Sequence, residues 1–342
     1  MAPSLSRTSR MEKFWKSTRR WLPGTLISVV VIAAILYFID LQELATAIIS
    51  ADWRYLLGGF IVSLLWLPMR AVVWRALLRN KAPFRHVFWT MCEGYLLNNL
   101  FPFRLGEIGR PFLLSRKTKL GFLEILPTIV LERIMDLVFS AIILLSAVPF
   151  VLGAAQAQNV AYMIGGLMVL GLIILYLLAR NRQWTVGLYE RLSSSRPTMQ
   201  KLGGKYLTSF FDGLEIITNG WVFLRAVMLM ALNWGIAIVQ FYLYIRAFFP
   251  QAEWIWSFFG LGATAFGNAI PSLPGAVGTY EGAFTGALIL LTGNEATSLA
   301  VALTAHMLGY VTNSILGVIA FSREGETIMG IYRQLKKRQE EN

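Results

Sequence analysis

The charged residues of one short segment have the types and the spacing to bind an anion. In "NNLFPFRLGEIGRP", residues 98–111, Arg104, Glu107 and Arg110 follow one another at intervals of three. In a helical turn these side chains would share one face and bridge one another. A guanidinium group pairs bidentately with a carboxylate or with a phosphate. The segment is therefore a candidate site for a ligand that carries a phosphate.

A second group of charges follows in the next apolar segment. Asp136 stands three residues after Arg133, so it is placed to pair with the arginine, and it stands four residues after Glu132. The six charges of the two groups sum to zero. One interpretation is a structural network that pins the first segment against the next helix. The other is a binding site in which a substrate phosphate displaces a carboxylate from an arginine.

The spacing N-x-x-P-x-x-x-G-x-x-G occurs twice, at positions 169 residues apart. The first copy consists of Asn99, Pro102, Gly106 and Gly109. The second consists of Asn268, Pro271, Gly275 and Gly278, and it is followed by Glu281, which has no obvious basic partner nearby in the sequence. Proline removes a backbone donor, and glycine permits a turn or a close approach. We expect the asparagines to cap the freed backbone groups and the N–H groups of the half-helices to face an anion.

Other kinds of chemistry have little support in the sequence. His306 is a lone histidine in an apolar segment, and we interpret it as a hydrogen-bonded interior residue rather than as a proton relay. No second histidine or cysteine stands at metal-ligand spacing, and the only cysteine is Cys92. Nucleotide-binding and nucleophile motifs are lacking too. We expect no metal, no cofactor and no catalytic residue.

The composition places these residues in a membrane. Of the 342 residues, 56% are hydrophobic and 15% are charged, and the mean hydropathy is positive, which is far from the balance of a soluble domain. The formal net charge is +12, and the basic residues lie between apolar segments. This distribution favours anionic lipid head groups as partners over nucleic acid, which we do not expect the chain to bind.

Six apolar segments are long enough to cross a membrane, for which a helix needs about 20 residues. They are Trp21 to Ile39, Tyr55 to Leu77, Leu126 to Val151, Val160 to Ala179, Trp221 to Phe249 and Ser298 to Phe321. Two further segments, residues 87–115 and 255–292, are broken into pieces too short to span. The first span follows a basic tail, and we interpret it as an uncleaved anchor rather than as a signal peptide.

The distribution of lysine and arginine predicts the orientation. These residues accumulate in both terminal tails, in the turn at 79–85 and in residues 180–218, whereas the alternate loops, the first at about 40–54, are mostly acidic. Both termini are therefore expected in the cytoplasm, with the chain in the inner (plasma) membrane. With six spans and both termini on the cytoplasmic side, each broken segment must enter and leave the membrane on the same side. The predicted fold is an all-α integral membrane protein with about six spanning helices and two re-entrant helical hairpins.

The predicted organisation has a basic tail at 1–20, a polytopic membrane domain at 21–322 and a charged tail at 323–342. Within the membrane domain, span, hairpin and span occur in two repeats, at about 55–151 and 221–321, and a cytoplasmic connector lies between them at about 180–218. The first repeat begins outside and the second inside, so the copies are inverted. Inverted repeats with broken helices are typical of secondary transporters.

Three motifs resemble the flippase-like transmembrane region of the lysylphosphatidylglycerol synthase family. They are "FPFRLGEIGRPFLLSRK", "LERIMD" and "PSLPGAVGTYEGAF", in this order, and the resemblance covers roughly residues 20–322. It implicates Arg104, Gly106, Glu107, Arg110, Glu132, Arg133, Asp136, Pro274, Gly275, Gly278 and Glu281. The family's bifunctional members carry a synthase domain after this region. We expect a stand-alone member without the aminoacyltransferase domain.

The resemblance implies a transporter or flippase rather than an enzyme. Its substrate would be an anionic phospholipid, an aminoacyl-phospholipid or a related lipid. The alternative is a membrane glycosyltransferase acting on a polyprenyl phosphate, which an archaeal branch of the family suggests. That enzyme would need a positioned base and a nucleotide-sugar site, and the cytoplasmic segments are short. A separate lipid-modifying enzyme and a second copy of the chain are further candidate partners.

Overall fold

The computed structural model describes residues 40–101, 104–152, 219–270 and 272–324, together with single positions between 166 and 191. These residues form helices joined by short turns, and no strand occurs among them. In chain order the elements are α2 (Leu41–Ser50), α3 (Trp53–Leu77), α4 (Phe84–Leu100), α5 (Leu105–Lys117), α6 (Phe122–Leu152), α10 (Gly220–Phe248), α11 (Trp254–Ala269), the 3₁₀ turn η1 (Pro274–Ala276), α12 (Thr279–Thr292) and α13 (Glu295–Glu324).

Four of these helices are long and apolar enough to cross a membrane: α3, α6, α10 and α13. They lie at the positions of four of the six predicted spans. The other two predicted spans, at 21–39 and 160–179, fall outside the described residues except for three single positions. The predicted tails and most of the predicted connector lie outside them as well. The described part of the chain is thus an all-α membrane protein.

The outward faces of the long helices are apolar, as a lipid environment requires. Large exposed side chains include Phe150, Trp221, Met228, Leu232 and Met307. In water such a surface would drive aggregation, whereas in a bilayer the hydrocarbon chains cover it. The helices satisfy their own backbone hydrogen bonds, so they need no water at that depth.

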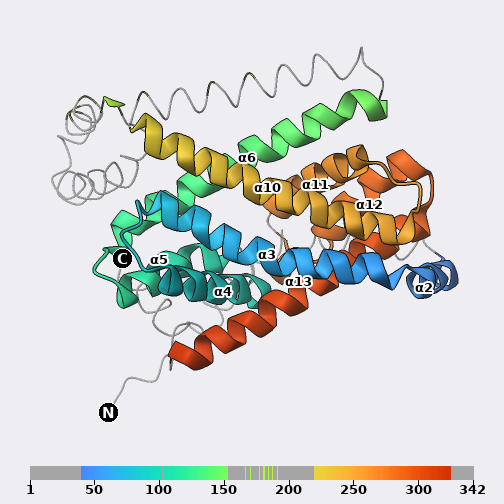
Figure 1. Cartoon of the computed structure of the whole chain (residues 1–342), viewed down its shortest axis with the longest axis horizontal. Helices are drawn as coiled ribbons and strands as arrows, with labels where there is room; N and C mark the ends of the chain where they lie inside the picture. The colour runs from blue at the N-terminus through green and yellow to red at the C-terminus, as the bar shows by residue number, and fades with distance from the viewer. Residues whose placement is uncertain are drawn as a thin grey trace, which may run out of the picture.

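Four of the shorter helices form two helical hairpins. α4 packs against α5, and α11 packs against α12. Figure 1 shows the two hairpins near opposite ends of the long helices. Their helices have 17, 13, 16 and 14 residues, which is too short for a helix to cross the hydrocarbon core alone. α4 also contacts η1, so the closed end of the second hairpin reaches the first hairpin.

The order of a long helix, a hairpin and a long helix occurs twice in the described chain. The most extensive helix contact joins α3 to α10, the first helix of each half. Two crossed contacts join α4 to α13 and α11 to α6. The first helix of each hairpin therefore packs on the last helix of the other half, which is what a two-fold relation between the halves produces.

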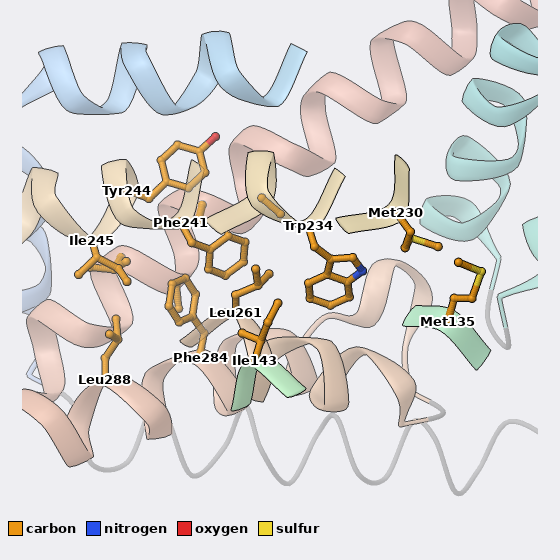
Figure 2. Close-up of a cluster of buried hydrophobic side chains, with 14 of the residues drawn as sticks. Met135, Ile143, Met230, Trp234, Phe241, Tyr244, Ile245, Leu261, Phe284 and Leu288 are labelled. Atoms are coloured by element: carbon orange, nitrogen blue, oxygen red, sulfur yellow. The ribbon is translucent and has the colours of Figure 1, made fainter. Parts of the chain in front are cut away.

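The largest buried apolar cluster surrounds α10. Figure 2 shows Trp234, Phe241 and Tyr244 of α10 in this cluster together with Phe284 of α12. The ring centroids of Phe241 and Phe284 are 4.9 Å apart. A Cβ atom on Gly59 of α3 would lie 2.5 Å from the Tyr244 ring. Small residues of this kind let membrane helices pack closely, and Gly59 permits the close contact between α3 and α10.

The segment at 40–54, predicted as a loop, contains the short helix α2. Asp40 caps this helix because its side chain accepts hydrogen bonds from the backbone N–H groups of Gln42 at 2.7 Å and of Glu43 at 3.3 Å. α2 packs against α13. The loop prediction rested on charge, which indicates the side of the membrane but not the local secondary structure.

Candidate functional site

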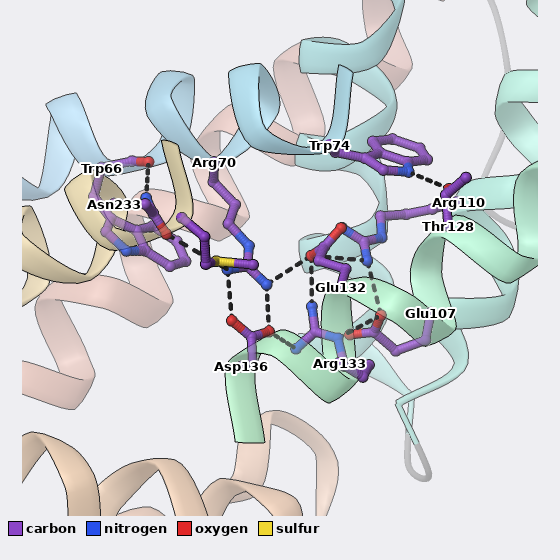
Figure 3. A network of polar contacts seen from close by, with 11 residues as sticks. Trp66, Arg70, Trp74, Glu107, Arg110, Thr128, Glu132, Arg133, Asp136 and Asn233 are labelled. Atoms are coloured by element: carbon purple, nitrogen blue, oxygen red, sulfur yellow. Dashed lines mark hydrogen bonds and ion pairs between the residues drawn. The ribbon is translucent and has the colours of Figure 1, made fainter. Parts of the chain in front are cut away.

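A network of ion pairs lies where α3, α5 and α6 meet (Figure 3). Three arginines and three carboxylates form it, so its formal charge is zero. An apolar bundle holds such a group only when each charge is paired, because an unpaired ion there costs several kcal/mol. The members are Arg70 of α3, Glu107 and Arg110 of α5, and Glu132, Arg133 and Asp136 of α6.

Arg70 connects α3 to α6. Its Nη1 donates to Asp136 Oδ1 at 2.7 Å, and its Nη2 donates to Asp136 Oδ2, so the pair is bidentate. Nη2 also donates to Glu132 Oε1 at 2.7 Å. The side chain is only 3% exposed. Sequence reasoning missed this residue, although a lone arginine inside an apolar span is a sign of a functional or structural pair.

Glu132 is the centre of the network. Its side chain is fully buried, and its Oε1 lies 2.7 Å from Arg70 Nη2, 2.9 Å from Arg133 Nη2 and 3.3 Å from both terminal nitrogens of Arg110. Three arginines from three helices therefore share one carboxylate oxygen. The other oxygen, Oε2, is buried without a hydrogen-bond partner among the described residues.

The exposed edge of the network consists of Arg133, Glu107 and Asp136. Glu107 Oε2 lies 2.9 Å from Arg110 Nη2 and 3.3 Å from Arg133 Nε, and Arg133 Nη1 lies 3.2 Å from Asp136 Oδ2. Two of the predicted pairs at i, i+3, Glu107 with Arg110 and Arg133 with Asp136, are thus present. The side chain of Arg133 is 32% exposed and those of the two carboxylates are 18% exposed. An anion that reaches the network meets these three groups first.

Two aromatic and polar contacts support the buried side of the network. The guanidinium carbon of Arg110 lies 4.9 Å from the centroid of the Trp74 ring, a cation–π contact. Trp74 Nε1 donates a hydrogen bond to Thr128 Oγ1 at 3.1 Å. On the other side, Asn233 of α10 lies 3.4 Å from Arg70 Nη1. Four helices thus hold the arginines in place.

Arg104 does not join the network, and the expectation that it would share a helical face with Glu107 and Arg110 is wrong. It precedes α5 in a left-handed backbone conformation, with φ 51° and ψ 47°, so it is not part of the helical turn. Its side chain is half-buried, and its guanidinium makes no ion pair with a described residue. The charges that act on it most strongly are Arg133, which repels it, and Glu107, which attracts it.

Glu281, for which the sequence offered no basic partner, pairs with His306 of α13. Glu281 Oε1 lies 2.6 Å from His306 Nδ1, and Glu281 Oε2 accepts the backbone N–H of Gly278 at 2.7 Å. His306 Nε2 lies 2.9 Å from the carbonyl oxygen of Gly275. His306 is thus a hydrogen-bonded interior residue, as the sequence indicated, while its role in proton transfer is a separate question. Its partner stands 25 positions away in the chain, beyond the reach of any local pattern.

Asn99 does not cap the break, contrary to expectation, because its side chain faces α13. Its Nδ2 donates to Tyr310 O at 3.1 Å and to Ser314 Oγ at 3.0 Å, and the Tyr310 hydroxyl donates to Asn99 O at 3.0 Å. The neighbouring Asn98 is the cap, since its Oδ1 accepts the N–H of Gly106 at 2.8 Å.

The N–H groups expected to face an anion are partly occupied. Those of Gly106 and Gly278 already donate to side chains of the protein. The side chain of Asn268 makes no hydrogen bond with a described residue, and the motif prolines Pro102 and Pro271 lie outside the described part of the chain. Guanidinium groups, rather than helix ends, are therefore the better candidates for binding an anion here.

The motif glycines serve two purposes. A Cβ atom on Gly106 would overlap the carbonyl oxygen of Gly94, so α4 and α5 approach closely there. Gly275 and Gly278 have φ values of 70° and 90°, which glycine adopts without strain. A Cβ atom on Gly275 would also lie 2.5 Å from the Tyr310 ring. Tyr310 therefore touches the closed ends of both hairpins.

The arrangement can exchange one anion for another at a guanidinium group, because carboxylate and phosphate oxygens accept the same hydrogen bonds. It offers no metal centre in the described ranges, where no group of three or more histidine, cysteine, aspartate or glutamate side chains could hold an ion. Residues 23–317 match the family described as the transmembrane region of lysylphosphatidylglycerol synthase. The chain belongs to this family.

The chain is similar to two archaeal proteins. A UPF0104 membrane protein of Methanocaldococcus jannaschii is 22% identical over 86% of this chain and 92% of its own length. The glycosyltransferase AglD of Haloferax volcanii is 22% identical over 86% of this chain, but the match spans only 52% of that relative. The family membership agrees with the resemblance of the three motifs. The matched region accounts for about half of the glycosyltransferase, so the activity in its name belongs to a protein of about twice this length.

Proposed function

We propose that the chain is a flippase that moves an anionic phospholipid, an aminoacyl-phospholipid or a related lipid between the leaflets of the inner (plasma) membrane. The observation that carries this proposal is the half-buried guanidinium of Arg104, which makes no ion pair with a described residue although Glu107 attracts it, and which stands beside a network that is already neutral. Family membership and the lipid-facing helices support the same proposal.

The charge balance at this place favours an anion. The network contains three guanidinium groups and three carboxylates, and Arg104 adds a fourth guanidinium. One positive charge is therefore left over in an apolar bundle, where it is costly unless a counter-ion pairs with it. A lipid phosphate supplies that charge and accepts hydrogen bonds from two guanidinium groups, those of Arg104 and of the partly exposed Arg133.

In the proposed membrane arrangement both hairpins are re-entrant and the two halves are inverted repeats. The shortness of the hairpin helices and the crossed contacts of α4 with α13 and of α11 with α6 support it. Six spans then place both termini in the cytoplasm. The head group would cross between the closed ends of the hairpins, residues 98–111 and 268–282, while the acyl chains stay in the bilayer. The phosphate thereby keeps polar partners throughout.

A membrane glycosyltransferase that acts on a polyprenyl phosphate is the second candidate. The relative named as a glycosyltransferase is the observation in its favour. Both candidates bind a lipid phosphate, so Arg104 could serve either. Incubation of the purified protein with labelled sugar donors, followed by thin-layer separation of the lipids, distinguishes them, since only the enzyme would produce a labelled lipid.

The replacement of Arg104 by glutamine tests the flippase proposal. We expect the variant to fold like the parent, because this side chain has no protein partner to lose, and to bind anionic lipid about tenfold more weakly or worse, since a charge-assisted hydrogen bond contributes about 1.5–3 kcal/mol. Arg104→Lys should recover only part of the loss at a bidentate site. Arg54→Gln, at an exposed arginine of α3, is the matched control.

The measurement is leaflet exchange of a fluorescent phosphatidylglycerol in phosphatidylcholine vesicles, read by chemical bleaching of the outer leaflet. Thermal unfolding of each variant is recorded alongside. If Arg104→Gln moves lipid like the parent, Arg104 does not bind the head group. If the parent itself does not exchange the probe, the flippase proposal fails for this lipid class.

A further inference from the structure

The contacts of His306 determine how many protons it shares with Glu281. The carbonyl oxygen of Gly275 can only accept a hydrogen bond, so His306 Nε2, 2.9 Å away, must carry a hydrogen. The contact of 2.6 Å between His306 Nδ1 and Glu281 Oε1 then requires one more proton between these two atoms. The pair therefore holds one exchangeable proton.

This proton makes the pair neutral wherever it resides. It forms either an imidazolium with a carboxylate or an imidazole with a carboxylic acid, and the charges sum to zero in both forms. Its release to water would leave the lone pair of His306 Nδ1 facing the negative oxygen of Glu281. Those two atoms repel each other, so the contact breaks when the proton leaves.

The shape of the second hairpin depends on this contact. Glu281 Oε2 holds the N–H of Gly278, and His306 Nε2 holds the carbonyl of Gly275, so the pair fixes both glycines of the turn. These glycines have positive φ values. The same turn touches Tyr310, which is hydrogen-bonded to Asn99 of the first hairpin. Loss of the proton therefore loosens the junction between the two closed ends.

We propose that Glu281 and His306 together form the binding site for a coupling proton, and that the lipid movement proposed above is driven by a proton gradient. The inference rests on that proposed function. In each cycle the pair takes one proton from water on one side of the membrane and releases it to water on the other side. The side chains of Glu281 and His306 are 10% and 14% exposed, so neither is completely enclosed by the bundle.

The surroundings of the pair leave it as the one site of charge change at this junction in the described part of the chain. The Tyr280 ring stacks on His306 with centroids 4.2 Å apart, and Tyr310 meets it edge-on at 6.2 Å. Tyr244 of α10 acts electrostatically on Tyr280. Neither Glu281 nor His306 makes an ion pair with any other described residue. Tyrosines stay neutral near pH 7, so they do not compete for the proton.

The stoichiometry suits an anionic lipid. One proton that crosses together with one head group of charge −1 moves no net charge, so the membrane potential does not oppose the step. A gradient of one pH unit can then shift the ratio of lipid between the leaflets by up to about tenfold, because one pH unit equals a factor of ten in proton activity.

Glu281→Gln is the informative variant. A glutamine amide N–H can donate to an unprotonated His306 Nδ1 and its oxygen can accept the N–H of Gly278, so the fold of the turn is kept without an exchangeable proton. His306→Gln removes the other member of the pair, the histidine. His86→Gln, at the second of the two histidines, is the matched control.

The first measurement uses the fluorescent phosphatidylglycerol in phosphatidylcholine vesicles with an imposed gradient of one pH unit. We expect the parent and His86→Gln to concentrate the probe in one leaflet and to reverse with the gradient, whereas Glu281→Gln and His306→Gln should not. If the parent exchanges the probe but ignores the gradient, or if Glu281→Gln still follows it, the proton site is wrong and the flippase proposal stands. No exchange by the parent under any gradient overturns the flippase proposal instead.

A second measurement decides the proton site without lipid movement. The variant Ser272→Cys, changed beside the turn, is labelled by a thiol reagent in a Cys92→Ala background at about pH 6 and about pH 8.5, on either side of the ordinary pKa of a histidine side chain. From the lower to the higher pH, the labelling rate should rise several-fold more in the protein with Glu281 than in the Glu281→Gln variant. Comparison with the variant corrects for the effect of pH on the reactivity of the thiol itself. Equal rises in the two would overturn the inference.

Discussion

The replacement of Arg70 by methionine tests whether the buried network is held together by charge neutrality. Methionine fills a similar length of the apolar space but removes the guanidinium that bonds Asp136 and Glu132. Asp136 then keeps only Arg133, at 3.2 Å, and the six-residue network, with which Arg104 makes no ion pair, carries one unpaired negative charge. We expect the free energy of unfolding to fall by about 3–5 kcal/mol, the range for breaking a buried ion pair by removing one partner.

The double variant Arg70→Met with Asp136→Asn restores neutrality. Two arginines then face two carboxylates, since Arg110 and Arg133 remain with their partners. We expect it to be more stable than Arg70→Met alone by about 2 kcal/mol, within the usual coupling of residues in one network. This gain in the free energy of unfolding comes from charge balance and not from a new contact, because the asparagine at position 136 cannot form a strong hydrogen bond with the methionine at position 70.

The assay is unfolding of the purified protein in micelles, followed by tryptophan fluorescence. Arg54→Met, at an exposed arginine of the same helix, is the control and should change stability by less than about 0.5 kcal/mol. The reasoning is refuted if the double variant is no more stable than Arg70→Met, or if Arg70→Met unfolds like the control. The first result would mean that Arg70 contributes only packing.

Two further predictions concern the fold. Gly106→Ala should destabilise the first hairpin by about 1–3 kcal/mol, because the new Cβ would overlap the backbone of Gly94, whereas Gly109→Ala meets only the movable end of the Leu97 side chain and should cost less in the same unfolding assay. Cysteine labelling from either side of the membrane tests the re-entrant hairpins. In each hairpin the two flanking positions should react from one side, with cytoplasmic labelling at Lys81 and Lys119 and outside labelling at Glu253 and Glu295, and opposite sides within one hairpin would exclude re-entry.

The helices of this protein were predictable because a membrane imposes length and polarity locally. The predicted span at Tyr55 to Leu77 agrees with α3 within two residues, and the one at Trp221 to Phe249 agrees with α10 within one residue. The breaks were visible because proline and glycine act on their own backbone. The recurrence of the spacing N-x-x-P-x-x-x-G-x-x-G was visible because a spacing is a local property, whereas the inverted repeat that it predicts stays a prediction.

The predictions from sequence were wrong where a side chain could bond either to local or to distant partners. Asn99 was expected to cap its own break but bonds to Tyr310, 211 positions away. Arg104 was expected to share a helical face with Glu107 and Arg110, but Arg104 itself has a left-handed backbone conformation and precedes the helix. Spacing rules apply only once a helix has begun, and the first turn of α5 starts one residue later.

The amino-acid sequence alone determined that this is a helical membrane protein, where its helices break, and which charges lie next to one another in the chain. Those properties follow from the apolar length and from interactions at i, i+3 and i, i+4. Only the tertiary structure decided that Arg70 binds Asp136, 66 positions away, and that Glu281 binds His306. Such pairs depend on which helix faces meet, and that is set by the packing of small and large side chains across several helices at once.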